Sequence, residues 1–97
     1  MAAMLKYPLN VGMNVLQLPA FTDLTNATVQ HQPGQTHPIQ MWVLADPSYP
    51  QAEDVHIYVA LTGESLPLAP NQAYHNLGTV QLNGGGFVVH ALLLKDA

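Results

Sequence analysis

Apolar and polar residues alternate along most of this chain with a period of two. Ile39, Met41 and Val43 occupy every second position of one segment, and the same alternation runs from Val55 to Leu61. Successive side chains of a β-strand leave opposite faces, so this pattern is typical of a strand that is buried on one side. No window has the apolar spacing of an amphipathic helix, and we expect no long helix.

Turn-forming residues separate these alternating segments at short intervals. Proline fixes φ and glycine accepts a positive φ, so runs that combine them favour tight turns and hairpin tips. The predicted turns are Asn10-Val11-Gly12, Gln32-Pro33-Gly34-Gln35, Asp46-Pro47-Ser48-Tyr49-Pro50 and Asn83-Gly84-Gly85-Gly86. The predicted strands are Leu5–Leu9, Val15–Leu18, Ala27–Gln32, Ile39–Leu44, Val55–Leu61, Gly78–Leu82 and Phe87–Leu94.

The pattern therefore predicts an all-β protein, a small antiparallel sandwich or barrel of about seven short strands. With 97 residues the chain has room for one domain, which we expect to span residues 1–97. Residues Thr62 to Asn76 include Pro67 and Pro70 and are predicted to form a long loop. Loops of this length are often functional, although a surface insertion without a function would look the same.

The segment from Phe87 to Leu94 is apolar on both faces of the predicted strand. If Val89 and every second residue beside it face the core, the other apolar side chains point the opposite way. Each of these, left in water, lacks roughly 1.5–3 kcal/mol of the stabilising free energy that full burial would provide. Such a strand is either central in a closed fold or covered by another subunit. The low content of charged residues favours the second alternative, and we expect a homo-oligomer that covers this second face. The predicted interface residues are Val88, His90, Leu92 and Leu94. His90 needs a hydrogen-bond partner from its own chain, a neighbouring subunit or a ligand.

Charged residues are scarce, at 8% of the chain against roughly a quarter in ordinary soluble domains. This scarcity favours self-association, because little repulsion keeps the surfaces of two copies apart. The chain has no arginine, and Lys6 and Lys95 are its only lysines. Two lysines cannot form the basic patch that a nucleic-acid polymer requires, so we expect none as a partner.

The ends of the chain indicate a cytoplasmic protein. Residues Met1 to Leu9 lack the apolar core of a signal peptide, and the apolar run Phe87–Leu94 is too short to cross a bilayer. We therefore expect no membrane association. Cysteine is absent, which excludes disulfides and thiolate chemistry.

No residue pattern predicts an enzyme. Ser48 and Ser65, the two serines, lie outside any Gly-x-Ser-x-Gly elbow, and the carboxylates are scattered. Among the five histidines, His31 and His37 are closest and flank a turn, which permits only a weak metal site. We expect no catalytic residues, no bound metal and no cofactor.

Aromatic side chains, histidines and glycines are the candidates for binding a ligand. Trp42 and Tyr58 lie on the second faces of their strands and could form a stacking shelf. The backbone of Gly84 and Gly85 could hold an anion, although a plain hairpin tip is the simpler interpretation. The candidate ligand-binding residues are Trp42, Tyr58, His75, His90, Gly84 and Gly85.

Several short motifs occur in a fixed order along the chain. They are Lys6-Tyr7-Pro8-Leu9, Met41-Trp42-Val43-Leu44-Ala45-Asp46-Pro47, Thr62-Gly63, Leu77-Gly78-Thr79-Val80 and Gly85-Gly86-Phe87-Val88-Val89-His90. In this order the chain resembles an uncharacterised family of small all-β phage and prophage proteins. The resemblance implies a phage setting and the host cytoplasm, and it assigns no catalytic residue. The chain departs from the family pattern at Glu64–Asn76, which is inserted, and at Ala91-Leu92-Leu93, where aromatic residues are usual.

Three classes of function fit these observations. The first is a non-catalytic phage accessory protein that counters a host defence. It would bind or sequester a host signal molecule, for example a nucleotide-derived one, or it would bind a host protein. The second is a minor structural or assembly protein of the virion, and the third is a histidine- or metal-dependent hydrolase. We expect the first class, because the residues combine a rigid β domain with no catalytic constellation.

Overall fold

Seven strands form the ordered framework of the protein. The computed structural model describes residues 2–20, 22–32, 39–48, 51–66, 73–82 and 87–95. The strands are β1 (Ala3–Leu9), β2 (Gly12–Pro19), β3 (Asp23–His31), β4 (Ile39–Ala45), β5 (Ala52–Leu61), β6 (Ala73–Leu82) and β7 (Phe87–Lys95). The described residues contain no helix, so the prediction of an all-β protein with about seven strands is confirmed. No helix long and apolar enough to cross a membrane occurs in this described part either.

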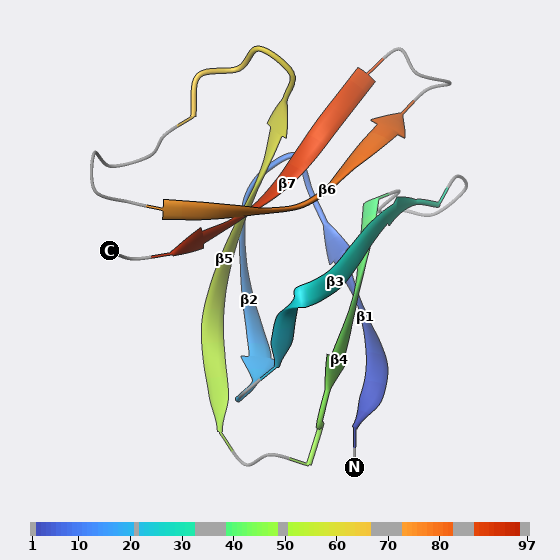
Figure 1. The fold of residues 1–97 in the computed structure, drawn as a ribbon, viewed down its shortest axis with the longest axis vertical. Helices are drawn as coiled ribbons and strands as arrows, with labels where there is room; N and C mark the ends of the chain where they lie inside the picture. Colours follow the sequence, from blue (N-terminus) through green and yellow to red (C-terminus); the bar gives the residue numbers. More distant parts are fainter. Residues whose placement is uncertain are drawn as a thin grey trace.

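The strands pair into two antiparallel sheets. One has the order β1-β4-β3 and the other the order β2-β5-β7-β6 (Figure 1). The sheets face each other, and the molecule measures 40 × 37 × 19 Å along its principal axes. Sheets pack face to face at about 10 Å, so the short axis corresponds to two layers. The sequence left a sandwich or a barrel open, and the two separate sheets make the fold sandwich-like.

The core lies between the two sheets and is built by the alternation seen in the sequence. Met41 and Val43 of β4 face Ile57 and Val59 of β5, and all four side chains are fully buried. The inward residues of β7, among them Val89, complete the same cluster. Burial of these side chains is the main favourable term in folding such a small domain.

β6 begins earlier than the sequence indicated. Ala73–Asn76, predicted as the end of a loop, form strand, with Tyr74 opposite Leu94 and Asn76 opposite Leu92. The pairing shifts between Asn76 and Gly78, where Leu77 is an extra residue. This bulge interrupts the period of two and hides the first half of the strand from a search for alternation.

The predicted turns have different roles in the fold. Asn10 and Val11 join β1 to β2, which lie in different sheets, and Gly12 then has a φ of 100°. Two connections are hairpins, because His31 pairs with Ile39 and Leu82 pairs with Phe87. The turn residues 33–35 and 83–86, which include Gly84 and Gly85, lie outside the described residues.

The corner at Asp46 connects the two sheets through the β4–β5 crossing. The Asp46 carboxylate accepts hydrogen bonds from the backbone N–H of Ser48, at 3.0 Å, and from the Ser48 hydroxyl, at 2.5 Å. The bond from the Ser48 hydroxyl is the largest of several causes that together lower the pKa of Asp46 from 3.8 to about 2. The carboxylate side chain thus orders the first residues of this turn, as Asp commonly does.

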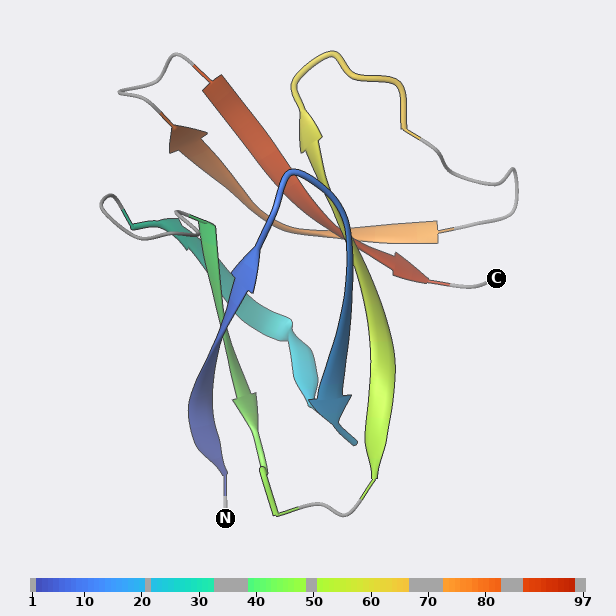
Figure 2. The same cartoon turned by 180° about the vertical axis from the view of Figure 1, so that it is seen from behind.

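A buried asparagine fixes β2 to the rest of the fold. Asn14 is 8% exposed, and its Nδ2 donates to the carbonyls of Asn10 at 2.8 Å and Ile57 at 3.2 Å. Its Oδ1 accepts from the backbone N–H of Asn10 at 2.9 Å. One amide therefore joins the end of β1, the start of β2 and the middle of β5. Figure 2 shows the course of these three strands.

Replacing Asn14 by alanine is expected to destabilise the fold by about 1–3 kcal/mol, because buried backbone groups lose their partner. Gln17→Ala is the matched control, since Gln17 is exposed on the same strand. The control should change stability by less than about 0.5 kcal/mol. Urea denaturation of both variants measures the difference. Equal stabilities for the two variants would contradict the structural role of Asn14.

Candidate functional site

The outer face of the β2-β5-β7-β6 sheet carries the most distinctive surface of the protein. On β7, Val89 and Ala91 face the core, whereas His90 and Leu92 belong to the opposite, outer face. Val88 and Leu94 share this face by alternation. Leu92 and Leu94 are nevertheless only 6% and 9% exposed, so something already covers them.

Residues 62–66, which we call the strap, supply this cover together with Tyr58 of β5. The chain reverses after β5, where Gly63 has a φ of 85° that suits glycine. Leu66 then packs against Ala60, Leu92 and Leu94 in a second apolar cluster. The sequence left open whether the protein's own fold or a second copy covers this face of β7, and the structure shows residues of the same chain packed on it. Oligomerisation through Val88, His90, Leu92 and Leu94 stays a prediction. Because Leu92 and Leu94 are buried within one chain, they no longer give a reason to expect it.

Hydrogen bonds hold the start of the strap. The backbone N–H of Thr62 donates to the carbonyl of Val88 at 3.2 Å, and that of Glu64 donates to Leu61 at 3.0 Å. The Glu64 carboxylate accepts from the Leu61 N–H at 3.1 Å and from the Tyr58 hydroxyl. Glu64 therefore ties the strap to the strand from which it emerges.

The contact between Tyr58 and Glu64 changes the titration of both groups. The hydrogen bond to Glu64 raises the pKa of Tyr58 above its ordinary value of 10.0, because it stabilises the protonated phenol. The same bond, with that from the Leu61 amide, lowers the pKa of Glu64 below 4.5. The hydrogen bond from Tyr58 to Glu64 is consequently fully formed at pH values between the two pKa values, where the phenol is protonated and the carboxylate is ionised.

Both ring nitrogens of His90 have partners within the chain. Nε2 lies 2.8 Å from the Thr62 hydroxyl, and Nδ1 lies 3.0 Å from the Thr79 hydroxyl. The Thr62 hydroxyl also lies 3.3 Å from the carbonyl of Val88. Each ring nitrogen can donate to or accept from its threonine, because a hydroxyl serves in both roles. The sequence left open whether the partner of His90 comes from its own chain, a neighbouring subunit or a ligand. In the structure, the partners are residues of its own chain.

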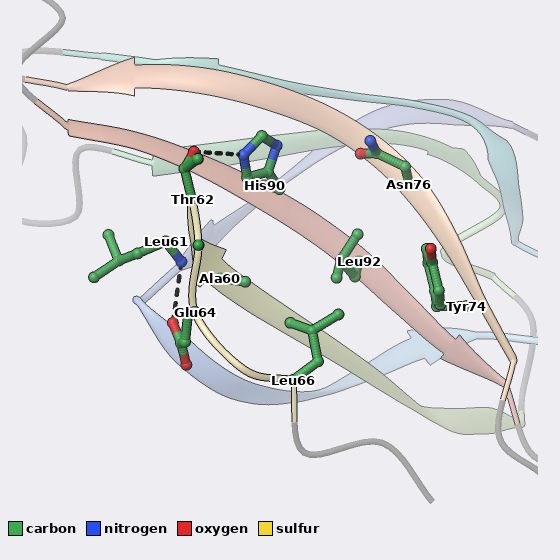
Figure 3. Close-up of a pocket in the computed structure, with 10 residues that line it drawn as sticks. Ala60, Leu61, Thr62, Glu64, Leu66, Tyr74, Asn76, His90 and Leu92 are labelled. Carbon is green, nitrogen blue, oxygen red and sulfur yellow. Dashed lines mark hydrogen bonds between the residues drawn. The ribbon is translucent and has the colours of Figure 1, made fainter. Parts of the chain in front are cut away.

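A pocket opens beside the strap, between it and β6 (Figure 3). Its volume is about 250 Å³, with apolar side chains from three elements and a rim of polar groups. The lining residues are Ala60, Leu61, Thr62, Gly63, Glu64, Leu66, Tyr74, Asn76, His90 and Leu92. A second hollow, of about 410 Å³, shares Leu61 and Thr62 with it and extends to Phe87 and Val88.

The structure brings together only part of the predicted ligand-binding set. His90 lines the pocket and Tyr58 lies beneath the strap. Trp42 is on β4, in the other sheet, so the stacking shelf proposed for Trp42 and Tyr58 is wrong. Each side chain does lie on the outer face of its own sheet, as predicted. The two outer faces, however, are on opposite sides of the sandwich. His75 pairs with the core-facing Leu93 and thus lies on the other side of the sheet from His90.

Sequence reasoning missed most residues that form the pocket. Glu64, Leu66 and Tyr74 fell within the predicted loop, where no periodic signal marks them. The partners of His90 were also missed, because Thr62 and Thr79 are 28 and 11 residues away. The one available signal was His90 itself, a polar residue inside an apolar strand that had to be satisfied.

The described residues offer no place for a metal ion built from three or more His, Asp or Glu side chains. His37, one of the histidines that flank the predicted Pro33-Gly34 turn, lies outside the described residues. The weak site considered for His31 and His37 thus stays a hypothesis.

Comparison with known proteins places the whole chain in one family. A family model described as a domain of unknown function, DUF7352, matches residues 1–97. The chain belongs to this family. That membership confirms the resemblance to an uncharacterised family of small proteins. No match was found among curated proteins or among solved structures.

The strap should respond to pH through Tyr58 and Glu64. Because the folded pKa of Glu64 is lowered, its contribution is present above 4.5 and is lost as the pH falls through the folded value. Because the folded pKa of Tyr58 is raised, its contribution is present below 10.0 and is lost as the pH rises through the folded value. Carboxyl chemical shifts in NMR measure the first of these titrations.

Tyr58→Phe should move the titration midpoint of Glu64 up towards 4.5, because it removes the hydrogen bond from the Tyr58 hydroxyl, which is the largest cause of the lowered pKa. Tyr74→Phe is the matched control, since Tyr74 lies across the pocket and should leave Glu64 unchanged. The same Glu64 midpoint in the wild type and Tyr58→Phe would show that the contact does not form in solution.

Proposed function

We propose that this domain is a non-catalytic binding protein, and that the pocket beside the strap receives an apolar side chain of a protein partner. The observation that carries the proposal is the pocket itself, with apolar residues at its centre and polar groups at its rim. Protein interfaces are commonly organised in this way, around a buried anchor that is surrounded by a polar rim.

The size of the pocket favours a single side chain as its occupant. Its volume of about 250 Å³ accommodates one large side chain and is close to the lower end of the range, roughly 300–1,000 Å³, of sites that enclose a whole small ligand. Leu66 and Leu92 supply apolar contact, and the exposed ring of Tyr74 stands at the edge. An exposed tyrosine next to a small apolar pocket is a common arrangement at protein interfaces.

The charge of the site argues against a nucleotide-derived signal. Glu64 is the ionisable acid of the lining, and the lining that the structure describes contains neither lysine nor arginine. Lys6 pairs with Trp42 on the outside of the other sheet. A phosphate would therefore meet a carboxylate at this pocket, without the cations that normally bind it.

The hydrogen bonds of His90 support binding without catalysis. In a catalytic triad the base holds its second N–H against a carboxylate, which stabilises the charged ring. Here the partners of the two ring nitrogens of His90 are the hydroxyls of Thr62 and Thr79 instead. The ring thus joins the strap to β7 and β6, which is a structural task.

The resemblance to phage and prophage proteins supplies a setting for this activity. We propose that the domain acts in the host cytoplasm as a counter-defence protein that occupies a host protein. A rigid sheet face with a single anchor pocket supports this role, since it requires no turnover.

Affinity purification from infected cells, quantified by mass spectrometry, tests the proposal. Tyr74→Ala removes the ring at the pocket edge, and Met4→Ala removes a similarly exposed side chain from the other sheet. We expect a stoichiometric protein partner whose recovery falls at least about tenfold with Tyr74→Ala, as for an interface anchor, and is unchanged with Met4→Ala.

Three results would count against this function. They are the absence of a stoichiometric protein partner, a partner that both variants retain equally, and a small molecule that native mass spectrometry finds bound in place of a protein. Turnover of a nucleotide, peptide or glycan that disappears with His90→Ala would refute the non-catalytic assignment.

A further inference from the structure

The four edges of the two sheets differ in how they are protected against pairing with another strand. Sheet edges are usually guarded by charge, by proline or by a bulge. On β1, Lys6 and Pro8 provide the first two. β3 and β6 both contain a bulge, and they lie against each other at one side of the sandwich.

β2 has none of these guards along most of its length. Residues Gly12–Leu18 contain no charged side chain, and the single proline, Pro19, is the last residue of the strand. The pairing with β5 runs from Gly12 to Pro19 without a bulge. No strand of the described residues pairs with the second edge of β2.

Two of the outward side chains of β2 are apolar and accessible. Met13 and Val15 are 49% and 57% exposed, on the outer face of the sheet. The hydrogen bonds of Asn14 to Asn10 and Ile57 fix the strand in place. β2 is therefore a rigid edge that is ready to accept a further strand at little cost in conformational order.

We propose that β2 is the site of homodimer formation, where the β2 strand of a second copy pairs antiparallel about a two-fold axis. Pairing over Gly12–Leu18 places Val15 opposite its own copy and Met13 opposite Gln17 of the partner. The two four-stranded sheets then become one continuous sheet. A two-fold axis uses the same surface on both copies, so no second kind of protein is needed.

Charge explains why a second copy fits this edge. The acidic residues of β5 nearest to β2 are Glu53 and Asp54, which pair with Leu18 and Gln17 at one end of the strand. An antiparallel arrangement sends these acidic ends to opposite ends of the dimer, where they do not meet. The surface is distinct from the pocket beside the strap, so the proposal is independent of the proposed function.

Sedimentation velocity over a concentration series tests the dimer. The purified wild type should dimerise reversibly. Val15→Lys places two lysines opposite each other across the axis and should raise the dimer dissociation constant at least about tenfold. Leu44→Lys is the matched control, because Leu44 is an exposed strand residue of the other sheet, at 47%. It should dimerise as the wild type does.

Cysteine crosslinking tests the register, since the chain has no cysteine of its own. Val15→Cys should form a disulfide-linked dimer on mild oxidation, because opposed residues lie within the reach of a disulfide. Leu44→Cys should not do so at the same protein concentration.

A wild type that stays monomeric throughout the series would overturn the proposal, and would leave the edge to a strand of another protein. A dimer that Val15→Lys does not weaken, or equal crosslinking of both cysteine variants, would also overturn it. Circular dichroism confirms that each variant is folded, as expected for exposed positions.

Discussion

The fold of this protein depends on the burial of both faces of one strand, β7. β7 is central in its sheet and apolar on both faces, so each face must be removed from water. The opposing sheet covers the inner face through Val89, Ala91 and Leu93. On the outer face, Leu66 of the strap and Tyr58 of β5 pack against the cluster of Ala60, Leu92 and Leu94.

This second cover also produces the candidate site. The strap must turn sharply at Gly63 to return over its own sheet, and it stands clear of β6, which leaves the pocket beside it. The groups that hold the strap, His90 and Glu64, are among the polar groups of the pocket lining. Structure and site are thus coupled, since a partner that enters the pocket contacts the residues that keep Leu66 in place.

The sequence predicted the features that depend on local pattern. The alternation from Ile39 to Val43 and from Val55 to Leu61 identified strands whose inward residues form the core. The sequence did not predict features that depend on topology. Period-two alternation cannot say which sheet contains a strand, so Trp42 and Tyr58 were grouped although they lie on opposite outer faces.

The strap was missed for a related reason. Leu66 is a single apolar residue in an irregular segment, and its importance appears only once the chain has reversed onto β7. The bulge at Leu77 likewise hid the strand residues that form the far wall of the pocket. The need for a cover over the Leu92 face could be predicted, but not which residues provide it.

Methyl NOE spectroscopy of the monomeric protein tests this account most directly. The structure predicts cross-peaks between the Leu66 methyls and those of Leu92 and Leu94, and these cross-peaks should persist on dilution. Absence of the cross-peaks, together with Leu92 shifts that change with protein concentration, would contradict the account. In that case a second copy, and not the strap, would cover β7.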